Sequence, residues 1–194
     1  MRILVVDDNP IHRASAETTL TGHEVVILSD YVSAEKTINI EHFDAVLIDL
    51  LMPVGSLAWT TKAKKALSQF LNQEMPIGWA LALLAALRGT KYVAIVSDDG
   101  HHDHPASSTL DYLCYKYGHE DRRFNVNGTR LLLFNGMSKH PLKCTDCDGT
   151  EHRVPTPDLC QTCSGRGSVF INGKNWGQAL EHLLDNTEWW KRDG

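Results

Sequence analysis

The stretch "RILVVDDN" (residues 2–9) decides the fold. Four apolar residues, Ile3–Val6, are followed at once by two adjacent aspartates, Asp7 and Asp8. A short, continuous apolar run with polar residues beyond it is typical of a strand buried on both faces of a parallel sheet. Two neighbouring carboxylates repel each other unless a cation lies between them. The stretch therefore predicts a buried strand with a cation site at its carboxyl end.

Four further apolar runs predict that this strand belongs to a sheet of five parallel strands. The predicted strands are Ile3–Val6, Val25–Leu28, Ala45–Ile48, Tyr92–Val96 and Arg130–Phe134. Five helical patterns alternate with them: one beginning at Pro10, one capped by Ser33, and three at 79–87, 110–117 and 176–184. This alternation predicts an α/β, doubly wound fold of the flavodoxin-like kind, with its site at the carboxyl ends of the strands.

Two segments do not fit that plan and are interpreted as insertions. Residues 54–75 follow the third strand and include "TTKAKKALSQFLNQE", an amphipathic helical pattern. Residues 137–173 separate the fifth strand from the last helix. The predicted domains are therefore an α/β body, residues 1–136 plus 174–194, and a small insertion before the last helix.

Composition narrows the class of protein. The 194 residues are 42% hydrophobic and 22% charged, with a net charge of −5, which is ordinary for a soluble globular protein and argues against a general nucleic-acid or membrane binder. No apolar run is long enough to cross a membrane, and Asp7 interrupts the N-terminal run before a signal peptide could form. Four of the five cysteines form two C-x-x-C pairs, which favours a metal site in a reducing compartment. We expect a cytoplasmic protein.

A third carboxylate is predicted at the same edge of the sheet as Asp7 and Asp8. Asp49 ends the third strand in "AVLIDLLMP", and Ser97 ends the fourth in "AIVSDDG". Because neighbouring parallel strands end at one edge, these side chains should lie close together. Carboxylate oxygens are the ligands that Mg²⁺ prefers, with waters completing its shell. The pattern predicts a magnesium site.

Three motifs resemble the receiver domains of two-component response regulators. They are "ILVVDDN" (3–9), "LIDLLMP" (47–53) and "VAIVS" (93–97), in the family's order and on the expected strands. The resemblance covers the α/β body and excludes both insertions. It implies that Asp49 accepts a phosphoryl group, that Asp7, Asp8, Asp49 and the backbone carbonyl of Leu51 bind Mg²⁺, and that Ser97 turns toward the phosphoryl group.

The function implied by this resemblance is a stand-alone, phosphorylation-dependent signalling switch rather than an enzyme. Its phosphoryl donor would be a sensor histidine kinase or a phosphotransfer protein, and its output would pass through a downstream protein or a homodimer. The alternative is a pseudo-receiver, a binding module stabilised by zinc and independent of phosphorylation. A metal-dependent phosphohydrolase is a third, weaker hypothesis.

One family feature is displaced in this chain. Receivers usually carry a lysine at the end of the fifth strand, but here Phe134 or Asn135 takes that place in "GTRLLLFNG". Lys174 in "GKNWGQAL" lies directly before the last helix, and Lys139 lies just past the strand. We favour Lys174 over Lys139 for the lysine's role, with Trp176 in place of the family's aromatic residue.

The second insertion carries a predicted zinc site. Its four ligands would be Cys144, Cys147, Cys160 and Cys163, in two C-x-x-C turns separated by 12 residues. Four thiolates at this spacing can complete a tetrahedron around Zn²⁺, so we expect a structural site. The pairs resemble the knuckles of DnaJ-type cysteine-rich domains and zinc ribbons. The insertion is nearly neutral in charge, which argues against a role in nucleic-acid binding.

A histidine cluster follows the fourth strand. His101, His102 and His104 stand in "DDGHHDHP", next to the predicted phosphorylation edge. Imidazoles can bind zinc together with a neighbouring aspartate, although such clusters are more often part of a solvated loop. The sequence leaves these alternatives open.

Overall fold

The computed structural model describes residues 1–53, 73–98, 122–136, 141–143, 168–170 and 173–185. The chain divides into two compact units, Met1–Met137 with Gly173–Gly194, and Ser138–Asn172. Each boundary falls one residue from the position expected from the sequence. The amphipathic pattern in the first insertion, apart from its last two residues, and the helical pattern at 110–117 lie outside the described residues.

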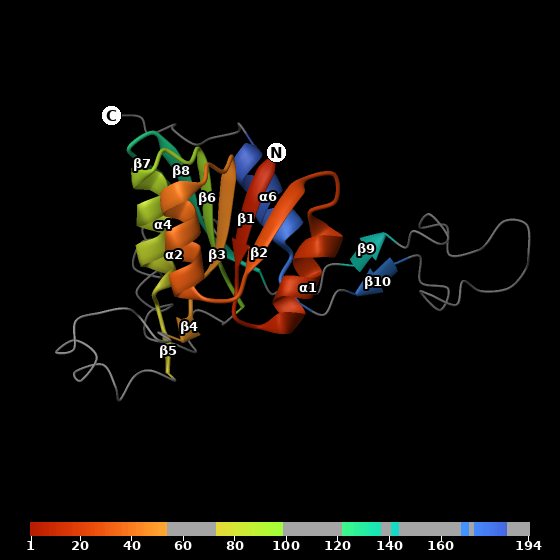
Figure 1. Ribbon diagram of the computed structural model, residues 1–194. Coiled ribbons are helices and arrows are strands. Elements are labelled where there is room, and N and C mark those ends of the chain that lie inside the picture. Colours follow the sequence, from red (N-terminus) through yellow and green to blue (C-terminus); the bar gives the residue numbers. More distant parts are fainter. Residues whose placement is uncertain (54–72, 99–121, 137–140, 144–167, 171–172, 186–194) are drawn as a thin grey trace, which may run out of the picture. The chain divides into compact units, whose positions relative to one another are not determined.

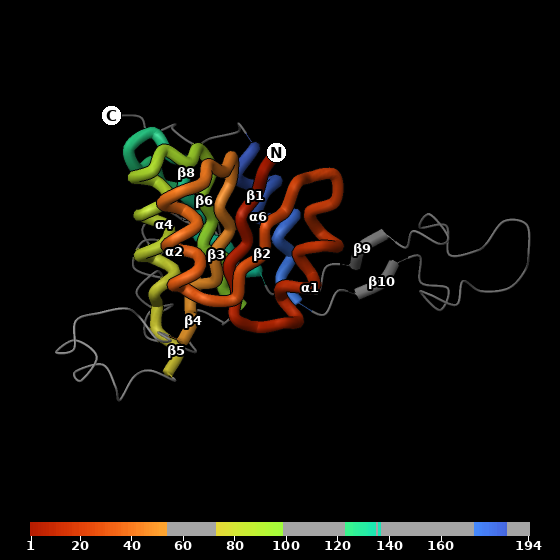
Figure 2. The backbone as a smooth tube through the Cα atoms, in the orientation of Figure 1, coloured from red at the N-terminus to blue at the C-terminus, as the bar shows by residue number. Residues whose placement is uncertain are grey.

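A six-stranded mixed sheet forms the centre of the first unit (Figures 1 and 2). Its order is β2-β1-β3-β6-β8-β7, and the first five strands are parallel. The bounds are β1 Arg2–Val6, β2 Glu24–Leu28, β3 Ala45–Asp49, β6 Tyr92–Ser97, β7 Arg122–Val126 and β8 Thr129–Asn135. All five predicted strands are confirmed, and the order of the parallel strands is that of flavodoxin-like sheets.

The prediction of an entirely parallel, five-stranded sheet was wrong, because β7 adds an antiparallel edge strand. β7 pairs with β8 through a two-residue turn in which Asn127 and Gly128 have φ values of 54° and 86°. The Asn125 side chain accepts a hydrogen bond of 2.8 Å from the Gly128 amide. Asn-Gly between two strand-like runs is the strongest short hairpin signal, and the sequence "FNVNGTRL" carries it.

Helices cover both faces of the sheet, and each face has its own core. α2 (Tyr31–Ile40) and α4 (Gly78–Leu87) pack on one face, whereas α1 (Pro10–Thr19) and α6 (Trp176–Leu184) pack on the other (Figure 1). Successive strand side chains point to opposite faces, so Leu4 joins the first core and Val5 the second. Burial on both faces explains why the strands read as continuous apolar runs.

Polar side chains fix where the helices begin. Asn9 caps α1 by accepting a hydrogen bond from the Ile11 amide, and Pro10 occupies the first turn as predicted. Asp30, rather than the predicted Ser33, caps α2, because its carboxylate accepts from the Ser33 amide at 2.9 Å. Asp30 stands three residues before Ser33 and outside the helix, which is the geometry that an N-cap requires.

α4 begins against the carboxyl end of β3. The Gly78 amide donates to the Leu50 carbonyl at 3.2 Å, and a Cβ at Gly78 would lie 2.1 Å from the carbonyl oxygen of Asp49. Only glycine permits this approach, which ties the start of the helix to the end of β3. The short strand β4 (Met52–Pro53), directly before the first insertion, pairs antiparallel with β5 (Glu74–Met75) at the end of that insertion.

In the second unit, the described residues form one antiparallel pair. β9 (Pro141–Lys143) pairs with β10 (Ser168–Phe170), with Lys143 opposite Ser168. Cys144 follows β9 directly, so the pairing brings together the two points between which all four paired cysteines lie.

Within the described residues, no helix has both the length and the apolar character needed to cross a membrane.

Candidate functional site

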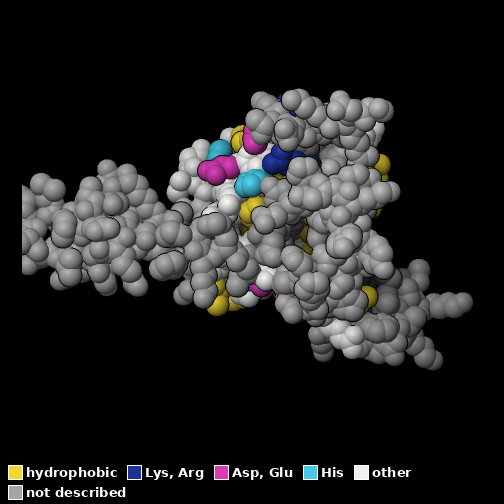
Figure 3. Space-filling model, turned by 180° about the vertical axis from the view of Figure 1, so that it is seen from behind, with side chains coloured by type: hydrophobic (Ala, Val, Ile, Leu, Met, Phe, Trp, Pro, Cys, Tyr) yellow, Lys and Arg dark blue, Asp and Glu magenta, His cyan; other side chains and the backbone are white. Residues whose placement is uncertain are grey.

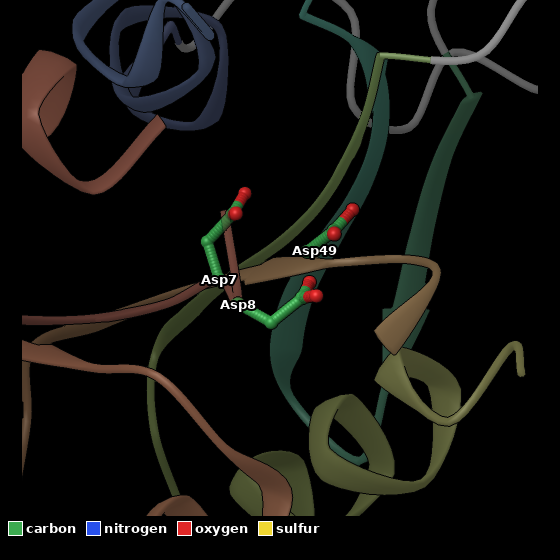
Figure 4. A group of neighbouring side chains, drawn as sticks. All are labelled: Asp7, Asp8 and Asp49. Atoms are coloured by element: carbon green, nitrogen blue, oxygen red, sulfur yellow. The ribbon is translucent and has the colours of Figure 1, made fainter. Parts of the chain in front are cut away.

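Three aspartates meet at the carboxyl edge of the sheet (Figure 4). Asp7 and Asp8 follow β1, and Asp49 is the last residue of β3, the strand that pairs with β1. One carboxylate oxygen from each lies within 4.8 Å of those of the other two. Asp7 and Asp49 are buried, whereas Asp8 is half-buried. The structure thus brings together the three acidic residues expected from the motifs.

The turn after β1 is held by its own neighbours. The Asn9 amide donates to Asp7 Oδ1 at 2.8 Å. Arg13, one turn into α1, donates through Nη1 to the backbone carbonyls of Asp7 and Asp8 at 2.9 and 2.6 Å. The guanidinium therefore binds the backbone and leaves the carboxylates of both aspartates to other partners.

Lys174 supplies a buried cation among these carboxylates. Its Nζ lies 2.8 Å from Asp7 Oδ2, 2.6 Å from Asp49 Oδ1 and 3.3 Å from Asp98 Oδ1. The side chain is fully buried, and its Nζ lies 5.6 Å from the centre of the Trp176 ring. Of the two lysines considered from the sequence, Lys174 reaches the aspartates; Lys139 lies outside the described residues.

Lys174 reaches the site because the chain re-enters the first unit beside the end of β8. The Asn175 amide donates to the Gly136 carbonyl at 3.3 Å, and a Cβ at Gly136 would lie 3.3 Å from Lys174 Cγ. Ser15 on α1 donates through Oγ to the Lys174 carbonyl at 2.8 Å. Residue 174 thus stands next to the end of β8, although 35 residues of the second unit intervene.

The electrostatics of the site reflect crowded carboxylates. Burial, partly offset by Lys174 and reinforced by Asp7, raises the pKa of Asp49 to about 7. Burial and the neighbouring Asp7 also raise the pKa of Asp8. Burial alone would lower the pKa of Lys174, but Asp49, Asp7 and Asp98 outweigh it and raise that pKa. Lys174 therefore stays cationic, and Asp49 is a carboxyl group that takes up a proton readily.

Two residues of the site were not identified from the sequence. Asp98 follows Ser97, and its Oδ2 lies 2.9 Å from Nε2 of His12 on α1. The hydrogen bond from His12, aided by Lys174, holds the pKa of Asp98 below its usual range. Asp98 could have been suspected from its place at a strand end. No sequence motif marks His12 as a site residue, because it occupies an ordinary buried position of the amphipathic helix α1.

A cleft of about 380 Å³ opens beside these side chains. It is lined by Asp8, Asn9, Pro10, His12, Asp49, Leu51, Glu74 and Asp98. Leu51, the expected carbonyl ligand, lines the cleft, and its amide lies 3.4 Å from Asp49 Oδ1. Ser97 ends β6 beside β8, where its carbonyl accepts from the Gly136 amide at 2.7 Å. A small, polar, partly open space therefore adjoins Asp49.

The acidic group is chemically suited to a hard divalent cation. Lys174 contacts one oxygen of Asp7 and one of Asp49, so Asp8 and the second oxygen of Asp49 stay available on the side of the cleft. One lysine faces three carboxylates, and Asp7 raises the pKa values of Asp8 and Asp49 in addition to the larger effect of burial. Oxygen donors next to a cleft with room for water match the preference of Mg²⁺.

The remaining predicted ligands cannot be placed. Cys144, Cys147, Cys160 and Cys163, and the cluster of His101, His102 and His104, lie outside the described residues.

Where described side chains reach the surface in Figure 3, acidic, basic and histidine side chains lie beside apolar ones. On that face, the described residues form no patch of a single charge of the kind that nucleic acid attracts.

Comparison with solved structures found similar chains, among them a receiver domain. The chain is similar to a solved structure of the Francisella response regulator 1452 receiver domain, with 19% sequence identity and a TM-score of 0.35. The match covers 59% of this chain and 91% of that one. No protein-family model and no curated protein matches the chain.

Proposed function

We propose that the protein is a response-regulator receiver, a phosphorylation-dependent signalling switch with Asp49 as its phosphoryl acceptor. The observation that carries the proposal is the contact of Lys174 with both Asp7 and Asp49 at the carboxyl edge of a flavodoxin-like sheet. Three carboxylates from the ends of β1 and β3, and one lysine just before α6, form a preorganised site for binding a phosphoryl group rather than a set of solvated acids.

The residues divide the work of phosphoryl transfer. An oxygen of the ionised Asp49 carboxylate forms a bond to phosphorus while the bond from phosphorus to the donor's leaving group breaks, which gives an acyl phosphate. The cleft beside Asp49 offers space for the phosphoryl group of the donor. Lys174 offers a fixed positive charge to the phosphoryl oxygens, and Ser97 lies at the same edge, where a hydroxyl can hydrogen-bond to them.

Asp7, Asp8 and Asp49, with the Leu51 carbonyl, would hold Mg²⁺, which when bound neutralises charge on the transferred phosphoryl group. The proposed donor is a sensor histidine kinase or a phosphotransfer protein, and the proposed output is contact with a downstream protein or a second copy of the chain. Nucleic acid and membranes are not proposed as partners.

We further propose that Cys144, Cys147, Cys160 and Cys163 bind one structural Zn²⁺. The pairing of β9 with β10 supports this, because it closes the segment that carries the four thiols. Elemental analysis of protein purified under reducing conditions should find one zinc per chain. Replacing Cys160 by serine should abolish most of it, whereas the matched control Cys114→Ser, outside both pairs, should keep it. Equal zinc in both variants would contradict the assignment.

The experiment that tests the proposed function is intact mass measurement after incubation of zinc-loaded protein with acetyl phosphate and Mg²⁺. The wild-type protein should gain one phosphoryl group, because Asp49 is the nucleophile beside the cleft. The Asp49→Asn variant should gain none, since an amide is a far weaker nucleophile. Absence of a gain in folded wild-type protein would favour a binding module that works without phosphorylation.

A further inference from the structure

Asp98 is a fourth carboxylate whose two oxygens serve different partners. Oδ1 lies 3.3 Å from Lys174 Nζ, and Oδ2 lies 2.9 Å from His12 Nε2. About a third of the Asp98 side chain is exposed, whereas those of Asp7 and Lys174 are fully buried. Asp98 is therefore the partner of Lys174 that can move with the least loss of packing.

Three carboxylates surround the Lys174 ammonium group. Asp7 Oδ2 accepts a hydrogen bond from Nζ at 2.8 Å, and oxygens of Asp49 and Asp98 lie 2.6 and 3.3 Å from Nζ, within ion-pair distance. A phosphoryl oxygen that approaches Lys174 therefore competes with these carboxylates for its positive charge. The contact with Asp98 is the longest of the three, and Asp98 is the most exposed of the three acids.

His12 is fixed in a way that allows it to keep Asp98. Its ring is buried, and its backbone carbonyl accepts hydrogen bonds from Trp176 Nε1 at 2.8 Å and from Ser15 Oγ at 2.7 Å. Within the described part of the chain, its Nδ1 atom has no hydrogen-bond partner. Among the described residues, the polar contact of the ring is with Asp98, so His12 can hold that carboxylate after Asp98 leaves Lys174.

We propose that Asp98 is a displaceable internal anion, a positioning residue that forms an ion pair with Lys174 until a phosphoryl group on Asp49 replaces it, and that His12 retains Asp98 afterwards. This role presupposes Asp49 as the phosphoryl acceptor, as proposed above. Asp98 then competes with the phosphoryl group for Lys174 and sets how readily the modified state forms. His12 lowers the cost of the exchange, because Asp98 keeps a hydrogen-bond partner after it leaves the lysine.

The test compares Asp98→Asn with the wild type in two assays in the presence of Mg²⁺. The first is calorimetric binding of beryllofluoride, a phosphoryl analogue; the second is the initial rate of mass gain over a range of acetyl phosphate concentrations. Loss of a charged competitor should tighten beryllofluoride binding about tenfold. It should lower the half-saturating acetyl phosphate concentration by a similar factor. Asp30→Asn is the matched control, because asparagine caps a helix as well as aspartate and the same charge is removed.

His12 is tested by a double-mutant cycle. His12→Leu should weaken beryllofluoride binding several-fold when Asp98 is present. The same substitution should not change binding in an Asp98→Ala background. His12→Gln, which keeps a side-chain donor, should bind beryllofluoride as tightly as the wild type. A purely structural role for His12 would weaken binding equally in both backgrounds. That result would overturn the part of the proposal that concerns His12.

The outcomes separate this proposal from the proposed function. If the wild type is phosphorylated and Asp98→Asn is no better than Asp30→Asn, the role of Asp98 is overturned and the proposed function stands. If only Asp98→Asn or Asp98→Ala is phosphorylated, Asp98 is the competitor described here, and in the wild type it prevents phosphorylation of Asp49. If no variant accepts a phosphoryl group or binds beryllofluoride, both proposals fail.

Discussion

Replacing Lys174 by methionine should lower the free energy of unfolding by about 3–5 kcal/mol in Mg²⁺-free buffer, the range typical of breaking a buried ion pair. Methionine keeps most of the length and the apolar stem but removes the charge. Asp7 and Asp49 would then be buried without the cation that now lies 2.8 and 2.6 Å from them. Urea unfolding of the zinc-loaded protein measures the loss.

Added Mg²⁺ should restore part of that stability, because a divalent cation can also balance Asp7, Asp8 and Asp49. The matched control is Lys36→Met, which removes the charge of an exposed lysine on α2 and should change the free energy of unfolding little. A loss in Lys174→Met no larger than in the control would show that the lysine is not the counter-ion of this site.

Replacing Asp49 by asparagine should remove a loss of stability with rising pH in Mg²⁺-free buffer. Burial raises the pKa of Asp49 to about 7, above the ordinary value of 3.8 expected in the unfolded chain. Between these values the folded state binds more protons than the unfolded state, so stability falls as pH rises through this window. Asparagine carries no charge and removes this contribution.

Thermal unfolding of zinc-loaded protein between pH 5.5 and 8 tests this sign. At pH 8 without Mg²⁺, Asp49→Asn should unfold roughly 5 °C above the wild type, and the difference should shrink toward pH 5.5. Saturating Mg²⁺ should stabilise the wild type at pH 8 far more than the variant, because the cation offsets a charge that the variant lacks. A constant difference across the pH range would contradict a raised pKa at Asp49.

Where prediction from the sequence succeeded, the signals were local. Each parallel strand contains a run of at least four apolar residues, which is buried in β1, β3 and β6, and its end is marked by the first polar residues after the run. Asp7, Asp8 and Asp49 could therefore be assigned to strand ends, and a shared edge follows from parallel pairing. β7 was missed although its Asn127-Gly128 turn is also a local signal, because the strand itself, "RRFNV", is not an apolar run.

Contacts between distant segments could not be predicted in the same way. Lys174 lies 38 residues beyond Gly136 in the chain but beside it in space, which no local pattern indicates. His12 and Asp98 are 86 residues apart, and their contact depends on how α1 packs beside β6.

The sequence by itself determined the α/β class, the parallel strands and the edge at which three carboxylates gather, because periodicity and burial act over a few residues. The sequence also favoured Lys174 as the cation of the site, but only the tertiary structure shows its contacts with the carboxylates and which histidine holds Asp98. Those contacts depend on the order of the strands and on where the chain re-enters the first unit. A buried charge needs a partner within a few ångströms, and the distance between two residues along the chain does not report the distance between them in space.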